Sequence, residues 1–332
     1  MIKILNSFKV ALERRIEIHA VKGYFDIQET NPDLINEIKN KIANHQLIIK
    51  RSVIENIIFP KNINVQLSLH QYLLTTLLGT MFSRVVLSSI HRKKKLIYPL
   101  PIPWLRVIEK SGLQVSYFWS SCFFYLFILM SWFIGFSNLF SHILINAKRE
   151  RINQKYSYFF NLDKKCIPSS HDKDRYDVIS WYSKKYSLKN SDNTRLVAHS
   201  VPNISNNVLG EHNTIYVQDC FPKMSFLSFY FKFLPAVIFT SLAIILSFRL
   251  RNIILLKEII DMYAFKFGDK NSIAQKYFFN YTNLLYRPLW TYIAELEGSG
   301  LIFYFYSCHI SNYQVPNKKD FTSGDFFQVF NW

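Results

Sequence analysis

Residue types that could bind a phosphorylated sugar lie together in the segment YRPLWTYIAELEG, residues 286–298. Pro288 suits the start of a helix, where unpaired N–H groups and the positive end of the helix dipole attract anions. Arg287 would add a guanidinium group that binds phosphate through two parallel N–H donors. A carboxylate farther along the helix, Glu295 or Glu297, could accept hydrogen bonds from a ribose or sugar hydroxyl. The segment therefore predicts a site for a nucleotide-activated sugar.

The same helix would place aromatic side chains beside these charged groups. With 3.6 residues per turn, Trp290 and Glu297 share one face, and Tyr292 lies near Glu295. The expected substrate-binding residues are therefore Arg287, Trp290, Tyr292 and Glu297. Packing is the alternative that the spacing also allows, with Trp290 in the core and Arg287 paired with a surface acid.

A second candidate for chemistry is His199, in the segment AHSVPNISN, residues 198–206. His199 and Ser200 directly follow a predicted strand, and α/β proteins place ligand sites in loops at the carboxyl ends of strands. His199 could act there as a base or as a phosphate ligand. The alternative is a polar connection with Ser200 as a cap. His199 and Glu295 are thus the two candidate catalytic residues.

Several strong enzyme signatures are absent from the sequence. It has no GxGxxG, GxxxxGK[ST], HExxH or GxSxG motif. Asp172 and Asp174 have the spacing of a metal-binding carboxylate pair, but the lysine and arginine around them favour a solvated turn. The four cysteines have neither zinc-binding nor CxxC spacing. We therefore expect no metal and no cofactor, with the nucleotide-sugar donor as a substrate.

The sequence also contains two long apolar runs. Residues 111–147 contain no Asp, Glu, Lys or Arg, and about 20 apolar residues suffice to cross a bilayer. The run at 224–248 is a weaker candidate because Lys232 and Pro235 interrupt it. Basic residues flank both runs on both sides, so the charges give no orientation. We expect membrane contact, either by crossing or by lying in the interface, with buried core helices as the alternative.

Helix and strand patterns alternate along the rest of the chain, which predicts an α/β fold. Helical patterns cover 31–45, 66–90 and 249–268, and the segment 95–118 predicts a βαβ unit. Strand-like runs lie at 46–50, 56–60, 176–186, 213–219 and 301–307.

The charge of the chain favours an anionic partner. Its 40 Lys and Arg against 23 Asp and Glu give a net charge of +17, which suits anionic lipid, a phosphorylated substrate or nucleic acid. The aromatic residues cluster in uncharged runs instead of alternating with Lys and Arg, and this argues against nucleic acid. The first residues have no long apolar core or cleavage site, so we expect a cytoplasmic location, at the inner face of a membrane.

The segment RPLWTYIAELEGSGLIFYFYS, residues 287–307, resembles the bacterial surface carbohydrate biosynthesis proteins encoded in O-antigen and capsule loci. Other stretches fall in the order of that group, namely IYPLPIPWLRVIEKSG, the aromatic apolar run, YFFNL before YDVISWY, and AHSVPN. The resemblance extends from residue 90 to the end. It implies a glycosyltransferase-like protein with two Rossmann-like lobes of GT-B type, acting on a nucleotide-sugar and a lipid-linked acceptor at the anionic cytoplasmic membrane surface.

The resemblance also implies a division of the chain. The expected regions are an N-terminal α/β region at 1–112, an apolar membrane-associated segment at 113–147, a continuation of the first lobe at 148–222, a second apolar and basic segment at 223–268, and the start of a second lobe at 269–332.

Two departures from the pattern of this group bear on activity. Ile293 stands where the resemblance implies a glutamate after Trp-Thr-Tyr, so the chain could be inactive, or Glu295 could substitute. The ending FFQVFNW leads us to expect an incomplete second lobe. Surface polysaccharide biosynthesis by a membrane-associated glycosyltransferase is thus the main interpretation, and a non-catalytic scaffold or inactive relative in the same pathway is the alternative.

Overall fold

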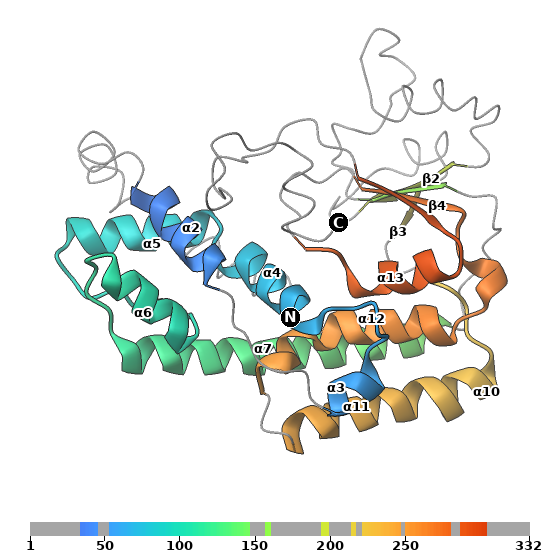
Figure 1. Cartoon of the computed structure of the whole chain (residues 1–332). Coiled ribbons are helices and arrows are strands. Elements are labelled where there is room, and N and C mark those ends of the chain that lie inside the picture. The colour runs from blue at the N-terminus through green and yellow to red at the C-terminus, as the bar shows by residue number, and fades with distance from the viewer. Residues whose placement is uncertain are drawn as a thin grey trace, which may run out of the picture. The chain divides into compact units, whose positions relative to one another are not determined.

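The computed structural model describes eight parts of the chain: residues 34–45, 53–146, 157–160, 194–198, 214–216, 221–246, 250–279 and 286–303. The chain divides into two compact units. The first unit comprises Met1–Met130, Leu284–Arg287 and His309–Trp332, and the second comprises Ser131–Asn283 and Pro288–Cys308. The described part of the first unit is helical, and the parallel sheet belongs to the second (Figure 1).

Helices build the described part of the first unit. They are α2 (Leu34–Asn44), α3 (Val53–Ile58), α4 (Val65–Leu77), α5 (Thr80–His91), α6 (Ile102–Lys110) and the first half of α7 (Tyr117–Asn146). Trp104 of α6 is fully buried, and its Nε1–H donates to the His45 carbonyl over 3.1 Å. His70 of α4 donates from Nε2 to the Ala43 carbonyl over 2.9 Å. Both bonds satisfy carbonyls at the end of α2, where a helix leaves its last acceptors unpaired.

The second unit contains the second half of α7, the remaining helices and a five-stranded sheet. The helical elements are α10 (Phe226–Ser228), η4 (Phe229–Phe233), α11 (Leu234–Leu246), η5 (Leu250–Leu255), α12 (Leu256–Phe267), η6 (Lys270–Ser272) and α13 (Leu289–Leu296). The strands are β1 (Ser157–Phe160), β2 (Thr194–Ala198), β3 (Thr214–Tyr216), β4 (Lys276–Phe279) and β5 (Gly300–Phe303). Their order is β3-β2-β1-β4-β5, and all neighbours are parallel.

The helices of the second unit lie in layers on one face of the sheet (Figure 1). α13 packs between the sheet and α12. Its Trp290 stacks on Phe265 of α12 at 4.6 Å and contacts Tyr277 of β4 edge-on at 5.0 Å. α12 in turn packs on α11. The end of α7 meets the start of α10, where the Asn146 side chain bonds both the N–H and the carbonyl of Met224.

Helices α10, η4 and α11 form one run, Phe226–Leu246, despite Pro235. A proline inside an α-helix removes one backbone donor and its ring clashes with the preceding turn. The π-helical turn η4 ends two residues before Pro235 and widens the backbone where this clash would fall. The interruption predicted at Lys232 and Pro235 is therefore a π-helical turn within a helix long enough to cross a membrane.

The expected two Rossmann-like lobes of GT-B type are wrong for this chain. Most of its described residues are helical, and their strands form a single short sheet. The strand expected at 56–60 begins inside helix α3, since a short apolar run does not distinguish strand from helix. The βαβ unit at 95–118 reduces to helix α6 between Leu96 and Val115, which form an isolated parallel bridge.

Other expected elements are present. α2 lies within the helix predicted at 31–45, and β3 and β5 lie at the strands predicted at 213–219 and 301–307. The single helix predicted at 66–90 is two helices, because Gly79 forms the N-cap of α5. The strands predicted at 46–50 and 176–186 lie outside the described residues.

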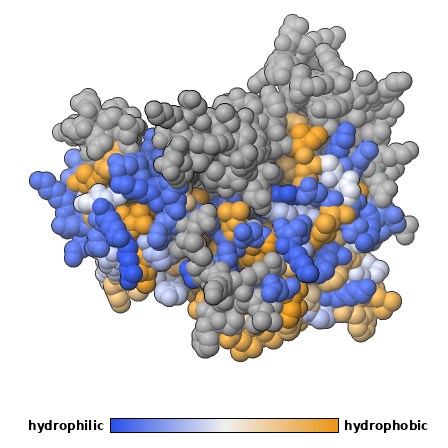
Figure 2. Space-filling model, in the orientation of Figure 1, coloured by the Kyte–Doolittle hydropathy of each residue, from blue (hydrophilic) through white to orange (hydrophobic). Residues whose placement is uncertain are grey.

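Large apolar side chains remain exposed on the two longest helical segments. Phe118, Phe140 and Leu144 of α7 are 60–71% exposed. Phe226, Phe231 and Leu246 of the α10–α11 run are 70–73% exposed. Figure 2 shows hydrophobic side chains along the lower edge of the view, where Figure 1 places α11. A contiguous apolar surface of this kind marks contact with a membrane or another protein.

Glycine 135 sets how closely α7 approaches α12. A Cβ atom at this position would lie 2.7 Å from Cγ of Leu256, closer than real Cβ atoms come to any carbon. A larger residue would therefore push the two helices apart or displace Leu256.

We expect Gly135→Ala to destabilise the second unit by about 1–3 kcal/mol, the usual cost of overpacking a core. Thermal unfolding in detergent micelles measures this loss. The double variant Gly135→Ala/Leu256→Ala removes the two closest contacts, those with Cγ and Cδ2 of Leu256, so its loss should be smaller than the sum of the two single losses. Gly300→Ala is the control, because its Cβ would meet Lys276 at an ordinary 3.5 Å. Additive losses in the double variant would contradict the predicted contact.

Candidate functional site

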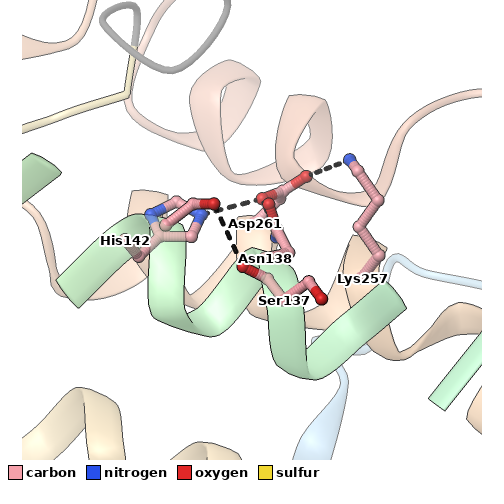
Figure 3. Close-up of polar contacts among 6 residues, drawn as sticks. Ser137, Asn138, His142, Lys257 and Asp261 are labelled. Carbon is pink, nitrogen blue, oxygen red and sulfur yellow. Dashed lines mark hydrogen bonds and ion pairs between the residues drawn. The ribbon is translucent and has the colours of Figure 1, made fainter. Parts of the chain in front are cut away.

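A buried carboxylate, Asp261 of α12, joins three polar side chains of the second unit (Figure 3). Its Oδ1 accepts hydrogen bonds from Asn138 Nδ2 at 2.7 Å and from His142 Nε2 at 2.9 Å. Its Oδ2 accepts a hydrogen bond from Lys257 Nζ at 2.7 Å. We call these four residues the Asp261 cluster.

The two helices place these partners by simple spacing. Asn138 and His142 are four residues apart on α7, and Lys257 and Asp261 are four apart on α12, so each pair lies on one face of its helix. Asn138 and His142 are polar residues inside a run otherwise rich in aromatic and aliphatic side chains. They face α12, while the exposed apolar side chains of α7 lie on its other side.

Electrostatics fix the charge state of Asp261. Burial by itself would raise the pKa of this carboxyl group, because removal from water disfavours the charged form. The Lys257 ammonium group and the hydrogen bond from His142 outweigh burial, and the pKa of Asp261 lies well below its usual range. Asp261 is therefore an ionised acceptor at neutral pH.

This arrangement positions helices and does not present a reactive group. The Asp261 side chain is 3% exposed, and both its oxygens already accept hydrogen bonds. A substrate cannot reach it without breaking the contact between α7 and α12. The Asp261 cluster thus acts as a structural connection between an apolar helix and the layers that lead to the sheet.

A second buried carboxylate of α12, Glu258, lies one turn earlier and points to α13. Its Oε2 accepts a hydrogen bond from the Leu289 N–H at 3.2 Å, and the residue is 5% exposed. Leu289 is the first residue of α13, so an internal anion occupies the positive end of this helix. The phosphate predicted to bind there would have to share the helix start with Glu258.

The structure places the predicted substrate-binding aromatic residues in the core. Trp290 is 6% exposed and stacks on Phe265, and Tyr292 is 3% exposed. The substrate-binding roles predicted for Trp290 and Tyr292 stay predictions. Glu295 and Glu297 lie at the exposed C-terminal end of α13, and Glu297 pairs with Lys270 at 2.7 Å.

The remaining predicted site residues are not brought to this core by the described structure. Arg287 is half-buried and belongs to the first unit, although it directly precedes the N-cap of α13 in sequence. His199 lies outside the described residues, directly after the last residue of β2. The roles predicted for Arg287, His199 and Glu295 stay predictions.

Sequence reasoning missed Glu258 and Asp261 as organising residues. The available signal was two acids three residues apart in an otherwise mostly apolar helix, LKEIIDMYAFKF. A charged group on a buried helix face requires a partner, so this spacing could have directed attention to polar residues elsewhere in apolar helices.

Residues 234–332 match the family model described as "Polysaccharide biosynthesis PFTS motif protein". The matched range begins with α11 and includes α12, β4, α13 and β5, hence both buried carboxylates. No curated protein and no solved structure matches the chain significantly. The family match supports a protein of polysaccharide biosynthesis.

We expect Asp261→Asn to destabilise the second unit by about 3–5 kcal/mol, as breaking a buried ion pair does. An amide group would turn its NH₂ toward the Lys257 ammonium or toward the donors on α7. Thermal unfolding of detergent-solubilised protein at neutral pH measures the loss. The control is Asp269→Asn, an exposed N-cap of η6 where asparagine caps equally well.

The same comparison should depend on pH in one direction. Because the pKa of Asp261 is lowered in the folded protein, its ionised form stabilises the fold fully above the unfolded pKa of about 3.9. The contribution is lost as pH falls below that value toward the folded pKa. The difference between wild type and Asp261→Asn should therefore shrink in acid, and a difference that stays constant from pH 7 to pH 3 would contradict this assignment.

Proposed function

We propose that this chain is a glycosyltransferase of surface polysaccharide biosynthesis, of the O-antigen or capsule type. It transfers a sugar from a nucleotide-activated donor to a lipid-linked acceptor at the cytoplasmic face of the plasma membrane. The observation that carries the proposal is the position of the family match. The matched residues join an exposed apolar helix, α11, to a parallel sheet through α12 and α13.

The parallel sheet supports a donor site at one edge. All five strands run in one direction, so their carboxyl ends lie at a common edge, where α/β proteins bind nucleotides and phosphates. In the sequence, His199 directly follows the last residue of β2. We therefore propose that the donor binds at the carboxyl edge of the sheet, with His199 as a base or phosphate ligand. We also propose Arg287, which directly precedes the N-cap of α13 in the sequence, as a phosphate ligand.

The layering favours helices that lie in the membrane interface over helices that cross it. α12 covers one side of α11 and of the second half of α7, and α13 and the sheet follow on the same side. Helices crossing the bilayer here would carry α12, with Glu258 and Asp261, and the open sheet toward hydrocarbon depth, where open sheet edges do not occur. Helices in the interface need only their exposed apolar sides in lipid.

We expect spin labels along one side of α7 to report equal, shallow depths in anionic vesicles. Suitable sites are Phe118, Phe133 and Leu144, which are exposed, lie within about 80° of one another around the helix and span about 39 Å. Single cysteines replace them in a cysteine-free background, and oxygen and nickel-chelate accessibilities give depth. A label at exposed Arg106 is the aqueous control. A much deeper label at 133 than at 118 and 144 would establish crossing instead.

Donor binding tests the catalytic part of the proposal. We expect wild-type protein to bind a sugar nucleotide saturably in a calorimetric screen, and Arg287→Ala to weaken this binding about 10- to 100-fold, the effect of losing a charged hydrogen bond. Arg106→Ala, an exposed arginine on α6, is the control and should leave binding unchanged. Wild-type protein that binds no member of a broad panel of sugar nucleotides would overturn the transferase.

A non-catalytic scaffold in the same pathway is the second candidate, and the core of α13 favours it. Trp290 and Tyr292 are used for packing, and Glu258 occupies the start of this helix. Ile293, where the resemblance implies a glutamate, is 5% exposed and contributes apolar packing. A scaffold would keep the fold and membrane contact while showing no heat in the same titration.

A further inference from the structure

An apolar groove in the first unit lies between α5 and α7 and ends at a cluster of basic residues. Its volume is about 700 Å³, within the usual range of sites for small organic ligands. The apolar lining comes from both helices and from the loop between α5 and α6: Met81, Val85, Ile97, Tyr98, Pro99, Phe123, Leu126, Phe127 and Met130. The polar lining consists of Ser88, Ser89, Arg92, Lys94 and Lys95.

The basic residues lie at one end of the groove. Leu96 forms backbone hydrogen bonds with Gln114 and Ser116, and the Tyr98 N–H donates to Ser120 Oγ at 3.2 Å. The loop that carries Lys94 and Lys95 is therefore held beside the start of α7. The apolar lining on α7 begins at Phe123 and continues to Met130, about two turns farther along. The groove thus has a cationic end and an apolar end.

The groove is continuous with the exposed apolar surface of α7. Phe123 and Leu126 are 45% and 50% exposed, and they belong both to the groove and to the exposed apolar surface of α7. A hydrocarbon chain can therefore enter sideways from a membrane in contact with α7. Arg92, Lys94 and Lys95 are all exposed, and in the described part of the chain none forms an ion pair.

The number of cations points to the type of head group. The phosphodiester of an ordinary anionic phospholipid carries one negative charge, whereas a terminal phosphate carries more than one at neutral pH. Three cations at one end match the more highly charged group. Basic residues at a helix C-terminus also favour the helix dipole of α5, but that effect does not account for an apolar groove beside them.

We propose that the groove between α5 and α7 binds a lipid with a terminal phosphate or diphosphate. The hydrocarbon chain lies along Val85, Phe123, Leu126 and Met130, and the phosphate lies on Arg92, Lys94 and Lys95. This inference rests on the proposed function in one respect: a lipid of this class would be the lipid-linked acceptor. The binding step itself requires no donor nucleotide.

Binding of a polyprenyl monophosphate to the full chain tests the groove. The protein is placed in phosphatidylcholine nanodiscs, and the polyprenyl monophosphate is titrated without any sugar nucleotide. Phosphatidylglycerol and inorganic phosphate serve as competitors. We expect saturable binding that phosphatidylglycerol displaces poorly, because it has a single charge, and that inorganic phosphate displaces poorly, because it has no chain.

Two kinds of variant separate the contributions of charge and groove. Arg92→Gln/Lys94→Gln/Lys95→Gln should weaken binding about a hundredfold. The control Lys61→Gln/Arg106→Gln/Lys110→Gln removes the same charge from exposed positions of the same unit that do not line the groove, and it should weaken binding less than about threefold. Val85→Trp and Leu126→Trp fill the groove from opposite helices, so each should abolish saturable binding even if the other variant folds poorly.

Three results would overturn the proposal: equal affinity for phosphatidylglycerol, equal losses in the two triple variants, or unchanged binding in both tryptophan variants that fold as judged by circular dichroism. A failure of sugar-nucleotide binding with lipid binding intact would refute the transferase and leave the groove assignment standing. Loss of lipid binding with donor binding intact would refute the groove assignment and leave the transferase standing.

Discussion

Burying Glu258 and Asp261 in the single helix α12 costs free energy that only well-placed partners can offset, and this constraint organises the second unit. Glu258 accepts a hydrogen bond from the start of α13, and Asp261 accepts one from a side chain of α7. The two carboxylates lie three residues apart, so α12 is held by polar contacts to both neighbours. Apolar packing alone would leave the rotation and register of these helices less well defined, because it is not directional.

This polar connection explains how an apolar helix and a parallel sheet share one compact unit. α7 has polar side chains toward α12 and apolar side chains on its exposed side. Gly135 allows α7 and α12 to approach each other closely at the same crossing. The ring of Trp290, in α13, contacts β4. The path from the exposed apolar surface to the sheet thus consists of specific, short-range contacts. A membrane-associated enzyme or scaffold needs such a path to hold its soluble layers at a defined distance from lipid.

Some cations of the described structure pair with acids, and others do not. In the second unit, Lys257 and Lys270 pair with acids and stabilise local structure. In the first unit, Arg92, Lys94 and Lys95 are exposed beside an apolar groove and suit an external anion. The net charge of +17 therefore does not show which cations are available to an external anion, because some of them pair with acids inside the fold.

The amino-acid sequence by itself determined the helices whose patterns are long. The run at 111–147 predicted α7, and the run at 224–248 predicted the α10–α11 segment despite Lys232 and Pro235, because about 20 predominantly apolar residues are typical of a long apolar helix. Its short runs were ambiguous, since a few apolar residues pack equally well in a strand or a helix, and residues 56–60 were assigned wrongly. The pattern at 286–298 correctly located helix α13 but could not decide whether Trp290 binds ligand or packs.

Tertiary structure decided how deeply Trp290 is buried, because burial depends on what lies opposite a side chain. Phe265 and Tyr277, distant in sequence, enclose Trp290. The pairing of Asp261 with His142 joins residues 119 positions apart, and no local pattern encodes such a partner. The groove between α5 and α7 likewise depends on how two helices and a loop pack together, which the spacing within each segment leaves undetermined.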